Sequence, residues 1–199
     1  MDLKKLSHDE LVQLVKDKKV GMAELTDAGI CPTCFDRANN NVLFGNNDDK
    51  IIYEDDKFEC YLVGNPRADG HVAISIKKHF KDMMEVDDEI CETIFLLAKR
   101  VMNLVKETYG AESVYLCTMC DGPMNHFHLQ LIPRYSFEKR GSNNFVKPRF
   151  EYKEDKEKIK TPILREFFKL INYLILKLVN ILNASSKNSS LVVSIEILT

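Results

Sequence analysis

The stretch Asp121-Gly-Pro-Met-Asn-His-Phe-His-Leu-Gln-Leu-Ile-Pro-Arg134 decides the fold of this chain. Polar and apolar side chains alternate along it, and the polar positions are His126, His128 and Gln130. Successive side chains of a β-strand point to opposite faces, so a strand here gathers the three polar groups on one face. Two imidazoles and an amide beside an apolar face cost free energy unless they find partners. We therefore expect a ligand site on this face, in preference to a half-exposed strand whose polar groups simply meet water.

An upstream stretch, Asn65-Pro-Arg-Ala-Asp-Gly-His-Val-Ala-Ile-Ser-Ile-Lys-Lys-His79, carries a Gly-His pair and ends with two lysines before a histidine. With Cys31-Pro-Thr-Cys34, the two stretches resemble the histidine triad (HIT) superfamily over roughly residues 30 to 150. The triad resembles the variant with Gln in the third position, as in the galactose-1-phosphate uridylyltransferase and diadenosine-polyphosphate phosphorylase branches. A triad is a specific motif, whereas the other two matches only support it.

The resemblance also implies a mechanism. An imidazole can attack the phosphorus of a nucleoside phosphate and split one displacement into two through a covalent intermediate. His128, the central histidine of the triad, is the nucleophile that the resemblance implies. Gln130 would then stabilise the phosphoryl oxygens through an amide hydrogen bond that involves no titrating proton. We expect a nucleotide hydrolase or nucleotidyltransferase acting on a nucleoside phosphate ester or anhydride, with a nucleotide or nucleotide sugar as substrate.

The pair Cys31 and Cys34 has the spacing of a metal knuckle, and we expect it in a loop. Tetrahedral zinc needs four nitrogen or sulfur donors, and the further candidates are Cys117 with Cys120, or the histidines. The apolar run 114–119 is typical of a buried strand, in which side chains three positions apart point to opposite faces. We therefore assign Cys117 to the core and Cys120 to a turn.

His79 and His126 are the better pair to complete a zinc site with Cys31 and Cys34. The resemblance implies the same set of two cysteines and two histidines, holding a structural Zn²⁺. The alternative, a redox pair formed by Cys31 and Cys34, lacks the strand and helix context of a thioredoxin-like motif.

Three short β-rich runs separated by turn compositions predict an antiparallel meander at residues 50–53, 58–63 and 71–76. His71 starts the third run after Gly70, and we expect it to anchor the turn, with a role near the ligand as the alternative. Apolar residues spaced by three and four predict one long helix over 87–109.

Asp87 or Asp88 would cap that helix, and Gly110 would end it. The predicted fold class is α+β, a HIT-like antiparallel sheet of about five strands with the long helix packed across it. A helical C-terminal extension would follow.

Length and charge limit the classes of function. The 199 residues suit one domain, and 28 basic against 30 acidic residues give a net charge of -2. That balance predicts no general attraction to nucleic acid or membrane, so any affinity for phosphate must be local. Residues 1–20 contain no apolar run typical of a signal peptide, and we expect a cytoplasmic protein with reduced cysteines.

A polar segment with five cations follows the triad, and its basic residues are Arg134, Lys139, Arg140, Lys147 and Arg149. Arginine can hold a phosphate through a two-pronged hydrogen bond. A solvated surface loop is the alternative for each residue taken alone. We take Arg134, Lys147 and Arg149, together with Asn125 beside the triad, as candidates for substrate binding.

The composition changes near Lys160, since residues 163–199 contain no Gly, Asp, His or Cys. We therefore place a HIT-like domain at 1–160 and an extension at 161–199. A polar stripe along residues 162–182 predicts an amphipathic helix. No transmembrane span is expected, because crossing a bilayer takes roughly 20 apolar residues. The helix can dock on the domain, form a contact in a homodimer or lie on a membrane surface.

The segment 118–124 departs from the family, because it lacks the pattern of Asn, Gly, Gln and Ser usual before the triad. Contacts to ribose and phosphate from this segment are therefore not expected in their usual form. This departure motivates an alternative function, a zinc-stabilised nucleotide-binding or adaptor protein without turnover.

Overall fold

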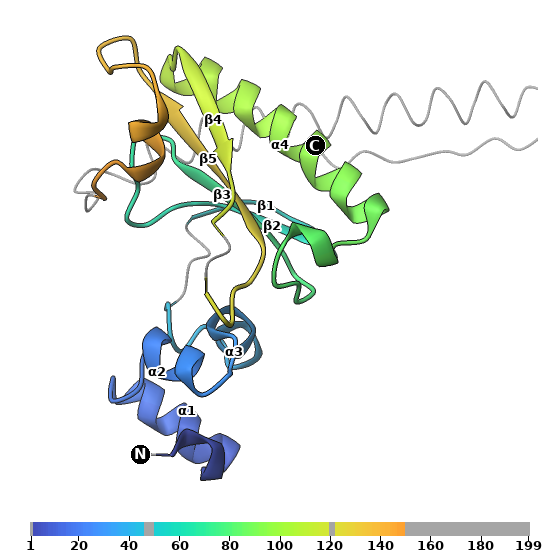
Figure 1. The fold of residues 1–199 in the computed structure, drawn as a ribbon, viewed down its shortest axis with the longest axis vertical. Helices are drawn as coiled ribbons and strands as arrows, with labels where there is room; N and C mark the ends of the chain where they lie inside the picture. The colour runs from blue at the N-terminus through green and yellow to red at the C-terminus, as the bar shows by residue number, and fades with distance from the viewer. Residues whose placement is uncertain (1, 46–49, 120–121, 150–199) are drawn as a thin grey trace, which may run out of the picture.

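The computed structural model describes residues 2–45, 50–119 and 122–149. Within them, five antiparallel strands form one sheet with one long helix, α4 (Asp88–Tyr109), across a face of it (Figure 1). The sheet order is β1 (Ile51–Glu54), β2 (Phe58–Leu62), β3 (Val72–Ile76), β5 (His128–Arg134) and β4 (Ser113–Cys117). This architecture confirms the predicted α+β class and the meander of the first three strands.

The main core lies between α4 and the central strands of the sheet. Ile74 of β3 and Leu129 and Leu131 of β5 are fully buried there, against Ile94 and Val101 of α4. Their spacing of two in the strands and seven in the helix is what directs each set toward the other element. The apolar half of the triad stretch is therefore the half that holds the sheet and the helix together.

The opposite face of the same strands carries the polar residues. The antiparallel register pairs Ser75 of β3 with His128 of β5, and Ala73 with Gln130. Residues paired across antiparallel strands have their side chains on the same face. The face away from α4 is therefore the one that carries the predicted chemistry.

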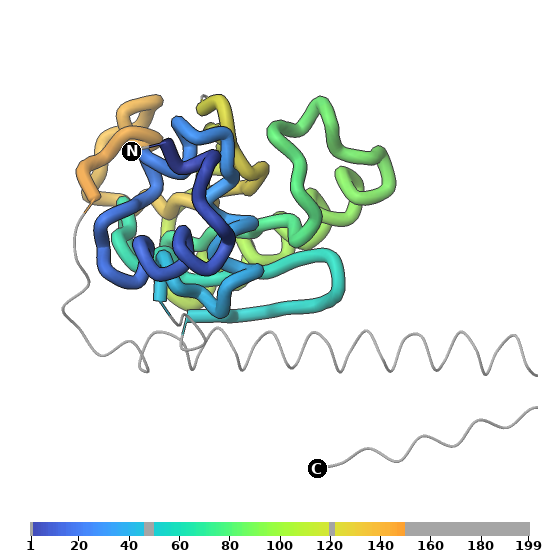
Figure 2. The backbone as a smooth tube through the Cα atoms, turned by 90° about the horizontal axis from the view of Figure 1, so that it is seen from below, coloured from blue at the N-terminus to red at the C-terminus, as the bar shows by residue number. Residues whose placement is uncertain are grey.

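Three short helices and a 3-10 turn precede the sheet: η1 (Leu3–Lys5), α1 (His8–Lys16), α2 (Met22–Asp27) and α3 (Pro32–Ala38). They bury a smaller apolar cluster of their own and gather beyond one end of the sheet (Figure 1; Figure 2 is viewed from that side). Arg37 of α3 connects them to the sheet, because its guanidinium donates to the Lys77 carbonyl at 2.9 Å and to Glu59 at 3.0 Å.

Helix α4 agrees with its predicted limits. Asp87 occupies the N-cap position, and Gly110 ends the helix in the left-handed conformation with φ 66°. Two further 3-10 turns, η3 (Met83–Glu85) and η4 (Ser142–Val146), lie before α4 and after β5. No helix of the described residues is long and apolar enough to cross a membrane.

Three local predictions need correction. Cys31 and Cys34 do not lie in a loop, because Cys31 is the N-cap of α3 and Pro32 begins the helix, where proline is favoured. Strand β5 begins only at His128, so His126 lies just before it. Cys117 is half-buried rather than a core residue, because β4 is an edge strand and places Cys117 opposite Gln130, on the polar face.

Several predictions fall on residues outside the described ranges. These are the turn position of Cys120, the domain boundary at residue 160 and the amphipathic helix over 162–182. They remain predictions.

Replacing Gly70 by Ala should destabilise the fold strongly. Gly70 has φ +70°, and an added Cβ would lie 2.7 Å from Cδ2 of Tyr109. The left-handed conformation costs a non-glycine residue about 1–2 kcal/mol, and overpacking against the ring adds about 1–3 kcal/mol. Gly29→Ala is the matched control, because Gly29 has φ +76° and nothing within 4 Å of the added Cβ. Urea unfolding should show the larger loss for Gly70→Ala; equal losses would contradict the clash.

Candidate functional site

His128 presents one defined nitrogen to the polar face of the sheet. Its Nδ1 lies 2.9 Å from the carbonyl oxygen of His126. A carbonyl oxygen can only accept, so Nδ1 carries the proton and Nε2 keeps its lone pair. The ring is half-buried, and it borders a cavity of about 610 Å³. His128 is therefore held with Nδ1 as the donor to the backbone and with Nε2 as the nitrogen directed to the polar face.

Gln130 lies next to that nitrogen on the same face of β5. Its Nε2 is 3.3 Å from Nε2 of His128, and the amide must be the donor because the imidazole nitrogen has no proton. The side chain is buried, and its Oε1 has no hydrogen-bond partner among the described residues. Gln130 thus has its donor end directed at the place where a group bound to His128 would lie.

His71 lies behind Gln130 and is also buried. Its Nδ1 accepts the backbone N–H of Arg67 at 3.1 Å, which confirms that it anchors the turn. Burial, helped by the nearby Arg149 and Arg67 charges, lowers the pKa of His71 to about 3, and contact with Gln130 opposes this shift. His71 is therefore neutral at pH 7, and it contacts the triad as well as the turn.

The cavity beside His128 is lined by α3 with the turn after it, by β1 and β2 with the loop that follows, and by the triad. Its walls include His126, His128, Ser75, Arg37, Phe44 and Arg149. The buried carboxylate of Asp36 accepts the backbone N–H groups of Leu43 and Phe44 at 2.6 and 3.1 Å. Asp36 therefore fixes the turn that supplies an apolar wall opposite the polar strand face. No local sequence pattern indicates this wall, because Asp36 acts through a backbone turn.

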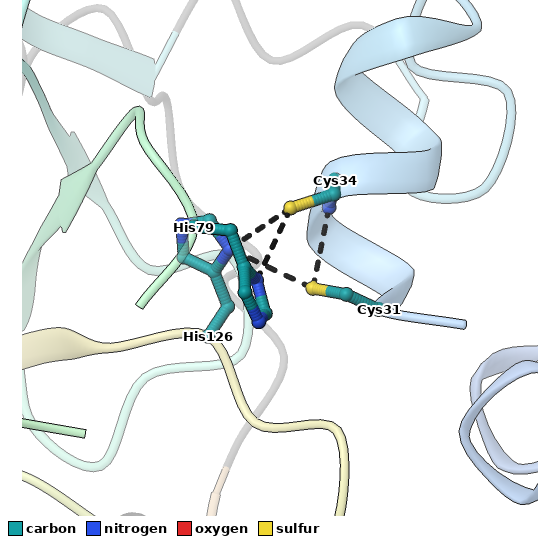
Figure 3. A group of neighbouring side chains, drawn as sticks. All are labelled: Cys31, Cys34, His79 and His126. Atoms are coloured by element: carbon teal, nitrogen blue, oxygen red, sulfur yellow. Dashed lines mark hydrogen bonds between the residues drawn. The ribbon is translucent and has the colours of Figure 1, made fainter. Parts of the chain in front are cut away.

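The four predicted metal ligands come together at the boundary between α3 and the sheet. Cys31 and Cys34 project from the start of α3, and His79 and His126 face them from the loops after β3 and before β5 (Figure 3). One ligand atom from each lies within 4.8 Å of all the others. His126 is separated from Cys34 by 92 positions and from Cys31 by 95 positions in the sequence, and the fold brings these side chains into one compact donor set.

The distances between donors fit a tetrahedral ion. Sγ of Cys34 lies 3.3 Å from Nδ1 of both His79 and His126, and Sγ of Cys31 lies 3.6 Å from Nδ1 of His126. Zinc bonds of about 2.3 Å to sulfur and about 2.0 Å to nitrogen place tetrahedral S and N donors about 3.5 Å apart. The arrangement can therefore hold a zinc ion with little movement of the four side chains.

The protonation of His126 also suits a ligand. Its Nε2 lies 2.6 Å from the Ile76 carbonyl, so Nε2 carries the proton and Nδ1 faces the sulfurs with its lone pair. Burial lowers the pKa of His126 to about 4, which keeps the ring neutral. Burial and the neighbouring Cys31 raise the pKa of the Cys34 thiol to about 11, and a bound cation would reverse that direction.

Of the four residues predicted to bind substrate, the structure brings only Arg149 to the cavity that His128 lines. Asn125 donates instead to the Lys81 carbonyl at 2.6 Å. Arg134 is on the face of His128 but six residues further along β5, about 20 Å away, where it pairs with Glu112 at 2.9 Å. Lys147 forms an ion pair with Glu138.

Comparison with known proteins finds relatives in one family. The family described as the HIT domain matches residues 45–137. An uncharacterized HIT-like protein of Methanocaldococcus jannaschii is 34% identical over 89 residues, which cover 43% of this chain and 69% of that protein. Another, from Borreliella burgdorferi, is 28% identical over 112 residues, which cover 53% of this chain and 81% of that protein.

A solved structure is similar in fold. The crystal structure of a Zn-bound histidine triad family protein from Mycobacterium smegmatis has a TM-score of 0.50 and 20% sequence identity to this chain. The match covers 62% of this chain and 86% of the other.

Acidification should destabilise the chain through His71. The pKa of His71 is lowered from 6.5 to about 3 in the folded chain, so the unfolded chain binds more protons between these values. Stability present above pH 6.5 is therefore lost as the pH falls, by about 1 kcal/mol per unit below pH of about 6. Urea unfolding at pH 7 and pH 5 should show a smaller loss in His71→Asn than in the wild type. Equal losses in the two proteins would be evidence against a neutral, buried His71.

Proposed function

Because this chain belongs to the HIT domain family, we propose that it is a nucleotide hydrolase or nucleotidyltransferase acting on a nucleoside phosphate ester or anhydride. The observation that carries the proposal is the fixed tautomer of His128, whose Nε2 lone pair borders the cavity. A nucleophilic imidazole needs that lone pair and a neutral ring. We place the chain in the branch with Gln in the third position of the triad, on Gln130.

In the first step, Nε2 of His128 forms a bond to phosphorus while the bond from phosphorus to the leaving oxygen breaks. The ring becomes an imidazolium, and the Nδ1 proton already bonded to the His126 carbonyl stabilises its charge. The Nε2 lone pair is then used, so the Gln130 amide is released to donate to a phosphoryl oxygen. Water or another phosphate would next take the nucleotide from His128.

We also propose that Cys31, Cys34, His79 and His126 hold a structural Zn²⁺. The donor set, its spacing and the protonation of His126 support this assignment. The similarity to a Zn-bound histidine triad protein adds support. When bound, the ion would supply no reacting group, but it would fix α3 against the sheet. The carbonyl of His126 orients His128, so the same anchor also positions the nucleophile.

The exposed surface of α4 and the edge of the sheet suggest a homodimer. Phe95 and Leu96 are 37% and 57% exposed on α4, and β4 pairs within the described chain only with β5. Exposed apolar side chains and an edge strand are each typical of an interface between subunits. We place the protein in the cytoplasm, where thiols such as Cys31 and Cys34 stay reduced and available to a metal.

An alternative function is a nucleotide-binding adaptor without turnover. It is favoured by Gln130, because an amide cannot deliver a proton to a leaving group as a histidine can. Incubation with a panel of nucleoside polyphosphates and nucleotide sugars separates the two functions. Product formation supports the enzyme, and binding without any product supports the adaptor.

His128→Ala and Gln130→Ala should differ in kind. Without the His128 nitrogen no other group lies in line, so turnover and the acid-labile nucleotidyl adduct should both be lost while binding survives. Gln130→Ala should slow the reaction by about 10²- to 10³-fold, the usual loss for one donor to a developing negative charge, and still form the adduct. Rapid-quench kinetics and adduct trapping would test both. An adduct in His128→Ala would remove its role as nucleophile.

The purified protein should contain about one zinc per chain. Replacing Cys31 and Cys34 together by Ser should remove the metal and lower the melting temperature, because metal binding contributes to folding free energy. Cys91→Ser is the control, since Cys91 is a free cysteine outside the cluster. Elemental analysis with thermal unfolding measures both effects. Full zinc occupancy in the double variant would refute the assignment.

A further inference from the structure

Near the cavity, the side chains of two arginines each bond to the backbone of another segment. Arg149 donates from Nη1 to the Asn65 carbonyl at 2.8 Å, and Arg67 donates from Nη1 to the Lys147 carbonyl. Each guanidinium uses only a backbone oxygen here, so its charge is not neutralised by the contact. Arg67 Nε is also buried without any hydrogen-bond partner among the described residues.

The neighbouring cations differ from this pair. Arg134 and Arg140 both pair with Glu112, and Lys147 pairs with Glu138. Within residues 2–45, 50–119 and 122–149, neither Arg67 nor Arg149 forms an ion pair with a carboxylate. Burial lowers the pKa of Arg149, and the positive charge of Arg67 lowers it further. Arg149 is exposed and Arg67 is half-buried, and two like charges held near each other repel until an anion joins them.

The position of the pair relates it to the nucleophile. Arg149 lines the same cavity as His128. Both guanidiniums also act electrostatically on His71, which contacts Gln130. The charges of Arg67 and Arg149 are therefore close to the triad, on the side where Gln130 and His71 lie.

We infer that Arg149 and Arg67 form a second phosphate subsite next to His128. The inference rests on the proposed function, in which a first phosphorus is attacked by His128. A phosphate group is the chemistry that fits, because it is an anion whose oxygens can accept from the free N–H groups of both forks. A purely structural clasp would need only donors to the Asn65 and Lys147 carbonyls, not two charges that pair with no carboxylate of the described residues.

The phosphate can come from two sources. One is the phosphoryl group next to the attacked phosphorus in the substrate, which then must be a diphosphate or longer. The other is free inorganic phosphate as the acceptor in the second step. In that case a phosphate oxygen forms a bond to phosphorus as the bond to Nε2 of His128 breaks. Nε2 recovers its lone pair, Nδ1 keeps its proton, and a nucleoside diphosphate leaves.

Binding of mono- and diphosphates tests the subsite without relying on turnover. Calorimetric titration would compare AMP with ADP and UMP with UDP on the wild type, Arg149→Gln, Arg149→Lys and Arg67→Gln. The wild type should prefer the diphosphate, and Arg149→Gln should weaken diphosphate binding about 10- to 100-fold, as for a lost charge-assisted hydrogen bond. Monophosphate binding should change by less than about twofold. Arg149→Lys should restore part of the loss, since it keeps the charge without the fork.

Arg140→Gln is the matched control, because Arg140 is in the same segment and already pairs with Glu112. It should bind both nucleotides like the wild type. In Arg149→Gln the new side chain can still donate to the Asn65 carbonyl, so the variant should fold. If it does not fold, Arg67→Gln provides a second measurement of the same subsite. Equal weakening of mono- and diphosphates in both variants, or no diphosphate preference in the wild type, would overturn the subsite.

Labelled inorganic phosphate separates the two sources. If the acceptor is phosphate, the label enters the nucleoside diphosphate product and Arg149→Gln abolishes its entry. If the substrate supplies the phosphate, inorganic phosphate only competes with diphosphate binding. Diphosphate preference without turnover of any substrate would support the subsite and refute the proposed reaction. No binding of any nucleotide would overturn both.

Discussion

The antiparallel pairing of β3 with β5 is the interaction on which the rest of the structure depends. It buries Ile74 beside Leu129 on one face, against α4, and places Ser75 beside His128 on the other. Because side chains alternate with period two, a slip of one residue would exchange the two faces. The apolar contacts with α4 therefore set the register of the chemistry, although they touch none of the groups that carry it.

The parts of this arrangement that follow a local period could be predicted from the sequence. The alternation of polar and apolar residues predicted that His128 and Gln130 share one face of a strand. Apolar residues spaced by three and four predicted the helix α4, which packs on the other face of the sheet. The donor chemistry of Cys31 and His79, together with the family resemblance, grouped them with the metal cluster that the structure brings together.

The parts that depend on tertiary partners could not be predicted. Five cations follow one another from the end of β5 onward, and the positions of Glu112 and Glu138 separate the paired ones from Lys139 and Arg149. His126 leaves the strand because the neighbouring Phe127 N–H bonds to the Phe80 carbonyl, a contact between distant loops. Arg67 gave no signal beyond its place in the upstream stretch, because its contact with the Lys147 carbonyl is tertiary and no carboxylate in the described part of the chain pairs with it.

Helix α3 has a role at both of its ends. Its first turn supplies Cys31 and Cys34 to the metal cluster, and Asp36 further along holds the turn that lines the cavity. Ligands at the two places would therefore act on one rigid element and be heterotropically linked. If a bound metal changes the affinity for nucleotide by some factor, a bound nucleotide must change the affinity for the metal by the same factor, because both effects share one coupling free energy. The zinc content of such a chain would then depend on its nucleotide supply.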